Sequence, residues 1–279
     1  MDEISDIQAY YDGAWDNEDN RLNRHQLEHD ITWLYLEKYL PLEGSYLLEI
    51  GAATGRYTLE LARRGYKVLA VDLSPQLVNR ARDRAIEAGL GDRIEFRVGD
   101  ARILKGIDKS VFDGALVMGP FYHLIEREDR VMALERVFES LISGGIVFTS
   151  WISRFGIFND LIKNLPGWIE NTEEVNPLLE RGCDPERHRD DVKGNFRWYF
   201  ALAEEINPIH QETGFHTLAL AASEPCISAD DASYNMLQGQ HRELWLDLLF
   251  RLSSEPSMVA SSRHLLYCGK KPEKSDDQM

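Results

Sequence analysis

The sequence is short of cysteine and of basic residues, and these shortages exclude several classes of protein. The three cysteines, Cys183, Cys226 and Cys268, are odd in number and far apart, so they indicate neither a disulfide framework nor a Cys-x-x-Cys metal site. Lys and Arg number 31 against 47 Asp and Glu, which gives a formal net charge of -16. Such a charge repels phosphate backbones at long range, so we expect no nucleic acid partner.

Long apolar runs are also lacking. No stretch approaches the about 18 apolar residues of a membrane span, and the first residues lack the basic and apolar regions of a signal peptide. We therefore expect no membrane partner and a cytoplasmic location. The 279 residues, 43% of them hydrophobic, are enough for a substantial core. The composition leaves the oligomeric state open.

What the sequence does contain is an alternation of short β-rich runs with longer segments of helical period, typical of parallel strands joined by crossover helices. Strands are predicted at 46–51, 67–73, 93–99, 112–118, 145–151, 215–223 and 262–271. Helices are predicted at 23–39, 158–165, 196–214 and 234–252, besides those between the first five strands. Between the second and third predicted strands, Ser74 can cap a helix, Pro75 suits the first helical position and Gly89 can end the helix.

The pattern predicts an α/β fold: a doubly wound, mostly parallel, seven-stranded Rossmann-like sheet with an antiparallel final strand. Its parts are expected to be an N-terminal helical lid (1–44), a core (45–152), an insertion (153–195), the rest of the same sheet (196–272) and a disordered tail (273–279).

The stretch "LLEIGAATG" combines a buried strand, a carboxylate and two glycines before a helix. Helix starts expose unpaired N–H groups, and glycines let a ligand approach the backbone. The nicotinamide-binding pattern G-x-G-x-x-G is incomplete, because Ala53 and Arg56 stand where it requires glycines. Glu49 would repel a pyrophosphate but would attract an ammonium or sulfonium group.

Two more acids end the next two predicted strands. Asp72 follows Gly51 by 21 residues, where a carboxylate can accept hydrogen bonds from both ribose hydroxyls, and Asp100 offers an acceptor for an amino group on a base. Acids at three successive strand ends suit a ligand with an amino acid end, a ribose and an adenine.

These motifs, "LLEIGAATG", "VLAVDLS", "VGDA", "FDGALVMGPFYHL" and "LISGGIVFTSWISR", resemble those of class I S-adenosylmethionine-dependent methyltransferases. The resemblance implies S-adenosyl-L-methionine as cofactor and a small-molecule acceptor methylated at O, N or S. One departure is Ala53, where the family often has glycine. The residues that the resemblance assigns to the cofactor are Glu49, Gly51, Ala52, Gly55, Asp72, Leu73, Asp100, Ala101 and Met118.

On the acceptor side, Tyr122 and His123 follow the fourth predicted strand and are the candidate catalytic residues. His123 could take a proton with a pKa near 6.5, or it could only orient its loop. Tyr11 and Arg21, in the expected lid, are candidate contacts to the cofactor's carboxylate, although a plain packing helix fits equally well. No metal site is predicted. Two alternatives stay open: a methyltransferase acting on a protein or RNA side chain, and a non-catalytic subunit that binds S-adenosylmethionine.

Overall fold

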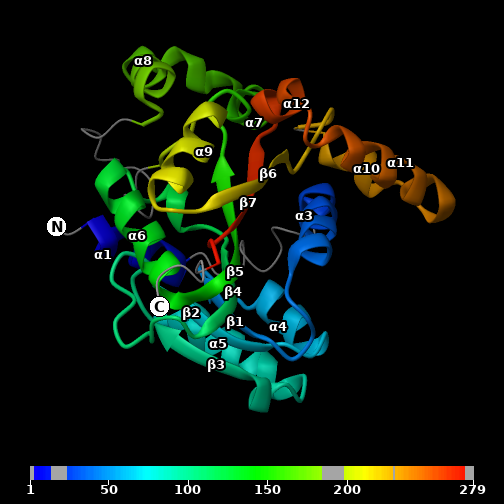
Figure 1. Ribbon diagram of the computed structural model, residues 1–279. Helices are drawn as coiled ribbons and strands as arrows, with labels where there is room; N and C mark the ends of the chain where they lie inside the picture. Colours follow the sequence, from blue (N-terminus) through cyan, green and yellow to red (C-terminus); the bar gives the residue numbers. More distant parts are fainter. Residues whose placement is uncertain (1–2, 14–23, 184–197, 229, 274–279) are drawn as a thin grey trace.

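The computed structural model describes residues 3–13, 24–183, 198–228 and 230–273. A single seven-stranded sheet forms its centre (Figure 1). The strands are β1 (Tyr46–Ile50), β2 (Lys67–Asp72), β3 (Ile94–Val98), β4 (Phe112–Val117), β5 (Leu141–Ile152), β6 (His216–Ala222) and β7 (His264–Lys270). Their order in the sheet is β3-β2-β1-β4-β5-β7-β6.

The pairings confirm the predicted fold class. β7 pairs antiparallel with both of its neighbours, whereas the pairs among β1 to β5 are parallel. Parallel strands end at a common edge, so the residues that follow β1, β2, β3 and β4 meet there. The chain order reverses between β1 and β4, and ligands of doubly wound sheets bind outside the strand ends at such a reversal.

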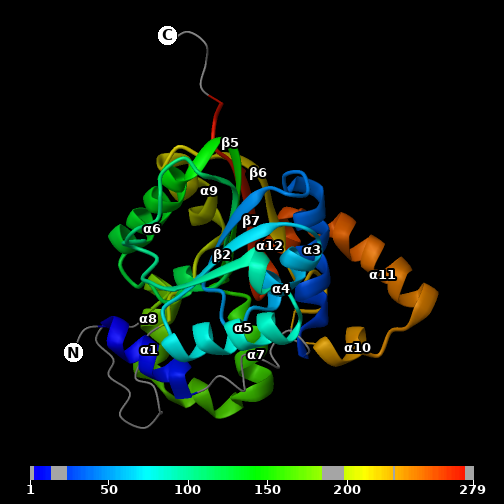
Figure 2. The same ribbon diagram turned by 90° about the horizontal axis from the view of Figure 1, so that it is seen from below.

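Helices cover both faces of the sheet (Figures 1 and 2). They are α1 (Glu3–Gly13), α3 (Gln26–Tyr39), α4 (Arg56–Arg63), α5 (Pro75–Glu87), α6 (Arg127–Ser140), α7 (Ile157–Asn164), α8 (Thr172–Arg181), α9 (Ala203–Glu212), α10 (Asp231–Asn235), α11 (Gly239–Leu252) and α12 (Pro256–Ser261). One core lies between the sheet and α3, α4 and α11, and the other between the sheet and α6 and α9. Burial of both faces explains why the central strands read as nearly continuous apolar runs.

The predicted start of α5 is confirmed in detail. The Ser74 side chain accepts a hydrogen bond from the backbone N–H of Leu77, Pro75 is the first helical residue, and Gly89 follows the helix with φ +69°. α1 packs along α5, as both views show (Figures 1 and 2).

Two predicted helices differ from the structure. The segment 234–252 is split, because α10 ends at Asn235 and α11 begins at Gly239 in a left-handed conformation, φ +51°. Residues 198–202, predicted as helix, are extended: Tyr199 N–H donates to the Tyr122 carbonyl and Ala201 N–H to the Ile152 carbonyl. These bonds to distant segments replace the local bonds of a helix, and α9 starts only at Ala203.

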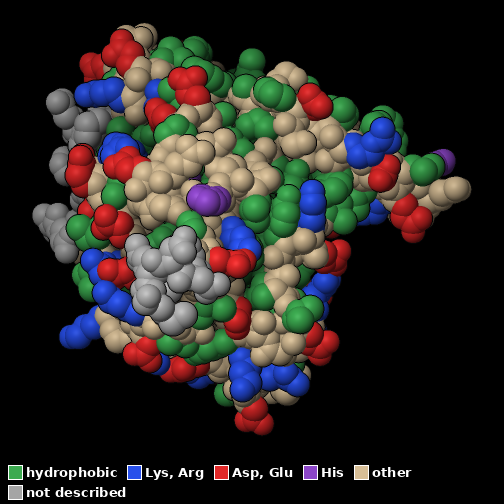
Figure 3. Space-filling model, in the orientation of Figure 1, with side chains coloured by type: hydrophobic (Ala, Val, Ile, Leu, Met, Phe, Trp, Pro, Cys, Tyr) green, Lys and Arg blue, Asp and Glu red, His purple; other side chains and the backbone are tan. Residues whose placement is uncertain are grey.

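In the part of the chain that the structure describes, no helix is both long and apolar enough to cross a membrane. On the face shown in Figure 3, acidic and basic side chains are interspersed among apolar ones, so the described residues there form no broad basic patch. The helices α7 and α8 lie beyond the carboxyl end of β5 (Figure 1).

Candidate cofactor and active site

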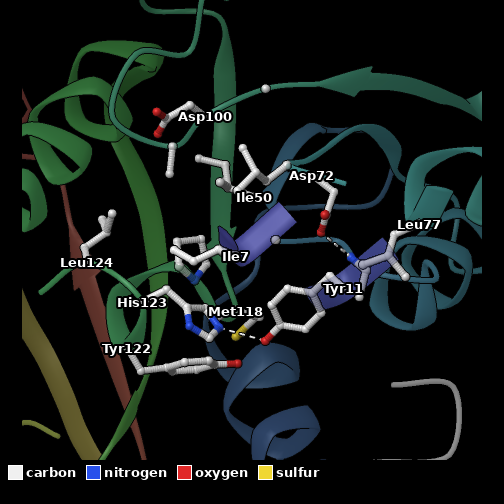
Figure 4. A pocket seen from close by; sticks show the side chains of 17 residues that line it. Ile7, Tyr11, Ile50, Asp72, Leu77, Asp100, Met118, Tyr122, His123 and Leu124 are labelled. Carbon is white, nitrogen blue, oxygen red and sulfur yellow. Dashed lines mark hydrogen bonds between the residues drawn. The ribbon is translucent and has the colours of Figure 1, made fainter. Parts of the chain in front are cut away.

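A pocket lies at the carboxyl ends of β1, β2, β3 and β4, and Ile7 and Tyr11 of α1 line one side of it (Figure 4). It is lined by Ile7, Tyr11, Ile50, Gly51, Ala53, Asp72, Leu73, Leu77, Gly99, Asp100, Ala101, Met118, Gly119, Pro120, Tyr122, His123 and Leu124. Among the predicted residues, nine line this pocket together: Tyr11, Gly51, Asp72, Leu73, Asp100, Ala101, Met118, Tyr122 and His123. The predicted Arg21 lies outside the described residues.

Gly51 forms the turn that leaves β1 toward the pocket. Its φ is +76°, and a Cβ atom at this position would lie 2.8 Å from Cδ of Pro120 and 3.3 Å from the carbonyl oxygen of Met118. Only glycine fits there without a shift of the 118–120 backbone. Ala53, the departure from the family pattern, also has a positive φ, +47°. The turn therefore holds a left-handed alanine in a conformation that glycine adopts more easily.

Asp72 closes β2 with its carboxylate at the pocket wall (Figure 4). Oδ2 accepts a hydrogen bond from Ala53 N–H at 2.8 Å, and Oδ1 accepts one from Ser74 N–H at 2.9 Å. The glycine turn and the start of α5 thus orient the same carboxylate. The Ser74 hydroxyl also hydrogen-bonds to Asp12 of α1, which ties the covering helix to this side of the pocket.

Asp100 lines the pocket but is engaged by a cation. Arg102 donates to both of its carboxylate oxygens and forms a second ion pair with Asp129 at 2.8 Å. The hydrogen bond to Asp100 is the largest cause of the raised pKa of Arg102. Ala101 and Leu73 line the pocket next to these acids. The Asp100 carboxylate, which we expected to accept a hydrogen bond from an amino group of the ligand, therefore already accepts hydrogen bonds from the Arg102 guanidinium.

Glu49, Ala52 and Gly55 lie beneath the pocket and do not line it. Glu49 is 1% exposed and accepts a hydrogen bond from the Thr58 hydroxyl. Burial raises the pKa of its carboxyl to about 8, with the Thr58 hydrogen bond opposing this rise and the charge of Asp72 adding to it. A Cβ on Gly55 would lie 3.1 Å from the Cβ of Ala81, so this glycine lets α4 approach α5 closely.

The covering helix contacts the predicted catalytic histidine. The Tyr11 hydroxyl and Nε2 of His123 form a hydrogen bond of 2.7 Å (Figure 4). The rings of Tyr122 and Trp198 lie 4.7 Å and 4.8 Å from the imidazole. Burial lowers the pKa of His123 to about 3, so the predicted value near 6.5 is corrected: the side chain is neutral at pH 7 in this arrangement.

Sequence reasoning missed several lining residues because they lie far apart in the chain or are plain apolar residues. Ile7 sits one helical turn before Tyr11, and a search of the lid for an apolar i, i+4 partner could have found it. Pro120 and Leu124 flank the candidates Tyr122 and His123 within the same short loop. Leu77, in the first turn of α5, carries no signal beyond its position after Asp72.

Two groups of His and carboxylate side chains lie close enough together to hold a metal ion: His25, Glu224 and Asp231, and Glu28, Glu224 and His264. Arg263 already inserts its guanidinium among them and ion-pairs with Glu224, with Asp160 at 2.7 Å and with Asp231 at 3.4 Å. Although burial raises the pKa of Glu224, the charges of His264 and Arg263 hold it well below its usual range. The cluster is therefore an ion-pair network that joins α3, α7, α10 and β7.

Comparison with known proteins agrees with the fold. Residues 47–145 match the family model described as a methyltransferase domain. A ubiquinone biosynthesis O-methyltransferase of Xylella fastidiosa is 28% identical over 152 residues, which are 54% of this chain and 59% of that protein. A magnesium-protoporphyrin O-methyltransferase of Rhodobacter capsulatus is 48% identical over 59 residues, 21% of this chain and 26% of that protein.

Among solved structures, a SAM-dependent methyltransferase of Methanosarcina mazei superposes with a TM-score of 0.61 at 18% identity, covering 86% of this chain and 98% of the other. This likeness concerns the fold. Residues 47–145 are thus similar to a methyltransferase domain, and the chain has the fold of a SAM-dependent methyltransferase. The chain spans less than two thirds of the length of the curated relatives named above.

Proposed function

We propose that the protein transfers the methyl group of S-adenosylmethionine to a small-molecule acceptor by in-line displacement. The observation that carries the proposal is the pocket at the reversal point of the sheet, where Gly51, Asp72 and Asp100 converge from three strand ends. Oxygen is the favoured acceptor atom, because the curated relatives named above are O-methyltransferases.

The residues present fit the cofactor. Gly51 lets the 118–120 segment lie close against the turn at the pocket, and Asp72 presents a carboxylate oriented by two N–H groups, as a ribose requires. We assign Asp100 and Ala101 to the adenine and Met118 to the region of the transferred methyl group. Glu49 acts from beneath the turn, where its ionised form would favour the ammonium end of the ligand.

The covering helix α1 must move for the cofactor to enter. The pocket encloses about 100 Å³, whereas ligand pockets usually measure about 300–1,000 Å³. Ile7 and Tyr11 of α1 line it, and the bonds from Tyr11 to His123 and from Ser74 to Asp12 hold the helix in place. We assign α1 the role of a lid whose closure excludes water from the reacting groups.

S-adenosylmethionine, when bound, supplies an electrophilic methyl group that needs in-line placement of the acceptor. The chain contributes that placement and a dry pocket, which can supply about 7–11 kcal/mol of the barrier. His123, neutral and held by Tyr11, faces the same space and is assigned the role of taking the acceptor's proton at Nε2 after Tyr11 moves away. Tyr122, stacked beside Trp198, walls the acceptor side.

The experiment is a calorimetric titration with S-adenosylmethionine, followed by transfer of labelled methyl from this cofactor to a metabolite extract. Binding with label in a small molecule supports the proposal. Binding without transfer to any acceptor would favour the non-catalytic subunit, and label in protein or RNA would favour the macromolecular alternative. Absence of binding by the folded protein would refute the proposal.

A further inference from the structure

A second cavity opens at the carboxyl ends of β4 and β5, next to the cofactor pocket. Its volume is about 750 Å³, and its walls come from the segment after β4, the start of α6, the end of β5, α8, the segment 199–202 and α9. Trp151 and Tyr199 contribute aromatic surface, and Ile206 and Ile209 contribute aliphatic surface. A cavity of this size and lining suits a small ring-shaped molecule.

Arg130 lies in the wall of this cavity as a buried cation. Its side chain is only 5% exposed, and Nη1 donates to the carbonyl oxygens of Leu124 at 2.6 Å and Ile125 at 2.7 Å. The guanidinium lies 3.5 Å from the centre of the Tyr199 ring. No carboxylate of the described residues forms an ion pair with it; burial lowers its pKa, and the charges of Tyr199 and Glu205 oppose this only in part. A buried charge without a counter-ion is costly, and a bound anion would remove that cost.

Three more arginines line the same cavity, and one of them adds to this positive charge. Arg154 pairs with Glu205 at 3.3 Å, and Arg127 pairs with Glu212, so their charges are compensated. Arg181, exposed at the end of α8, has no carboxylate partner among the described residues. Glu180, Glu204 and Glu205 line the same cavity. Glu205 pairs with Arg154 and its charge also acts on Arg130, but none of the three forms an ion pair with Arg130.

The two cavities share one wall. Leu124, whose carbonyl accepts from Arg130, lines the cofactor pocket, and Ile125 lines the second cavity. Tyr199 N–H donates to the carbonyl of Tyr122 at 2.9 Å, so the segment 122–125 separates the two spaces. A molecule in the second cavity therefore lies directly beside the loop that carries His123.

We infer that the second cavity binds an aromatic carboxylate, with Arg130 and Arg181 as its counter-ions. This site lies beside the cofactor pocket and is separate from it. Guanidinium groups suit this role because they can hold both oxygens of a carboxylate at once.

The first test uses benzoate as a probe and benzamide as its neutral counterpart. Benzoate is expected to raise the melting temperature of the wild type saturably, and benzamide is not. Arg181→Gln should weaken benzoate binding about tenfold or more, as expected for loss of a charge-assisted contact. Arg251→Gln, an exposed arginine on α11, is the matched control and should bind like the wild type.

Equal shifts with benzoate and benzamide, or unchanged benzoate binding in Arg181→Gln, would overturn the anion site. Arg130→Lys keeps the charge but loses the two-pronged geometry, and it should also bind benzoate more weakly. If Arg130→Lys does not fold, Arg181→Gln still tests the anion site, because the Arg181 side chain is exposed and forms no hydrogen bond or ion pair with another described residue.

The second test asks whether the anion site is independent of the cofactor pocket. Cofactor affinity, measured by calorimetry, should be the same in Arg181→Gln and wild type, and a weaker affinity in the variant would overturn the separation of the two sites. Failure of the wild type to bind the cofactor would refute the proposed function, while the benzoate titration would still report on the anion site.

Discussion

Replacing Glu49 with glutamine tests the electrostatics beneath the glycine turn. The carboxyl is 1% exposed and receives a hydrogen bond from Thr58. Burial is the main reason that its pKa rises from 4.5 to about 8. At pH 7 the folded protein therefore holds mainly the neutral acid, which a glutamine side chain imitates in shape and charge.

The sign of the effect follows from the direction of this shift. Because the folded-state pKa lies above the unfolded value, the contribution of Glu49 to stability is fully present below about pH 4.5 and is lost as the pH rises through about 8. At about 1.4 kcal/mol for each tenfold change in the ionisation constant, the loss is roughly 5 kcal/mol at most. Glu49→Gln cannot ionise, so it should be as stable as the wild type near pH 4.5 and several kcal/mol more stable at pH 9.

The assay is urea unfolding at pH 5, 7 and 9 without cofactor, followed by tryptophan fluorescence. Glu87→Gln, at an exposed position at the end of α5, is the control and should follow the wild type at every pH. A difference between Glu49→Gln and wild type that stays constant from pH 5 to 9 would refute the reasoning, since it would mean that Glu49 ionises normally in the folded state.

Other predictions concern the pocket, the lid and partner choice. Asp72→Asn should weaken S-adenosylmethionine at least about tenfold by calorimetry, through loss of charge-assisted hydrogen bonds, while the exposed Asp92→Asn should not; equal affinities would remove Asp72 from the site. Tyr11→Phe loses the bond to His123 and should speed cofactor association in stopped-flow measurements; an unchanged rate would contradict the lid. Burial lowers the pKa of His123 to about 3. Between pH 5 and 8, the pH profiles of kcat/KM for the wild type and for His123→Asn should therefore have the same shape, and a loss of activity toward pH 5 that only the wild type shows would contradict this pKa. At physiological salt, the dissociation constant for transfer RNA should be larger than the range of about 10⁻⁴ to 10⁻⁶ M that is typical of non-specific binding. A micromolar dissociation constant that depends on salt would instead favour a macromolecular acceptor.

The sequence by itself determined the sheet and the edge where the pocket forms. The repeats of apolar residues that indicate strands and helices are local features of the sequence. The helix cap at Ser74, the first helical residue Pro75 and the glycine turn at Gly51 are local as well. The acids at the ends of β2 and β3 follow from the same patterns, because a parallel sheet brings consecutive strand ends to one edge. These features needed no knowledge of which distant residues touch.

Only the tertiary structure decided what surrounds those residues. Glu49 lies beneath the pocket, and not in its wall, because Thr58 of α4 packs over it, and burial then shifts its pKa. Tyr11 meets His123 across 112 positions of sequence, and burial lowers the pKa of the histidine.

The acceptor side depended on tertiary contacts even more strongly. Residues 198–202 have a pattern compatible with a helix, yet their backbone bonds to Tyr122 and Ile152 hold them extended. That course places Tyr199 against Arg130 and forms a wall of the second cavity. Burial and the pairing of charges depend on every neighbour at once, so a pattern read along one segment predicts the element but not the environment of its side chains.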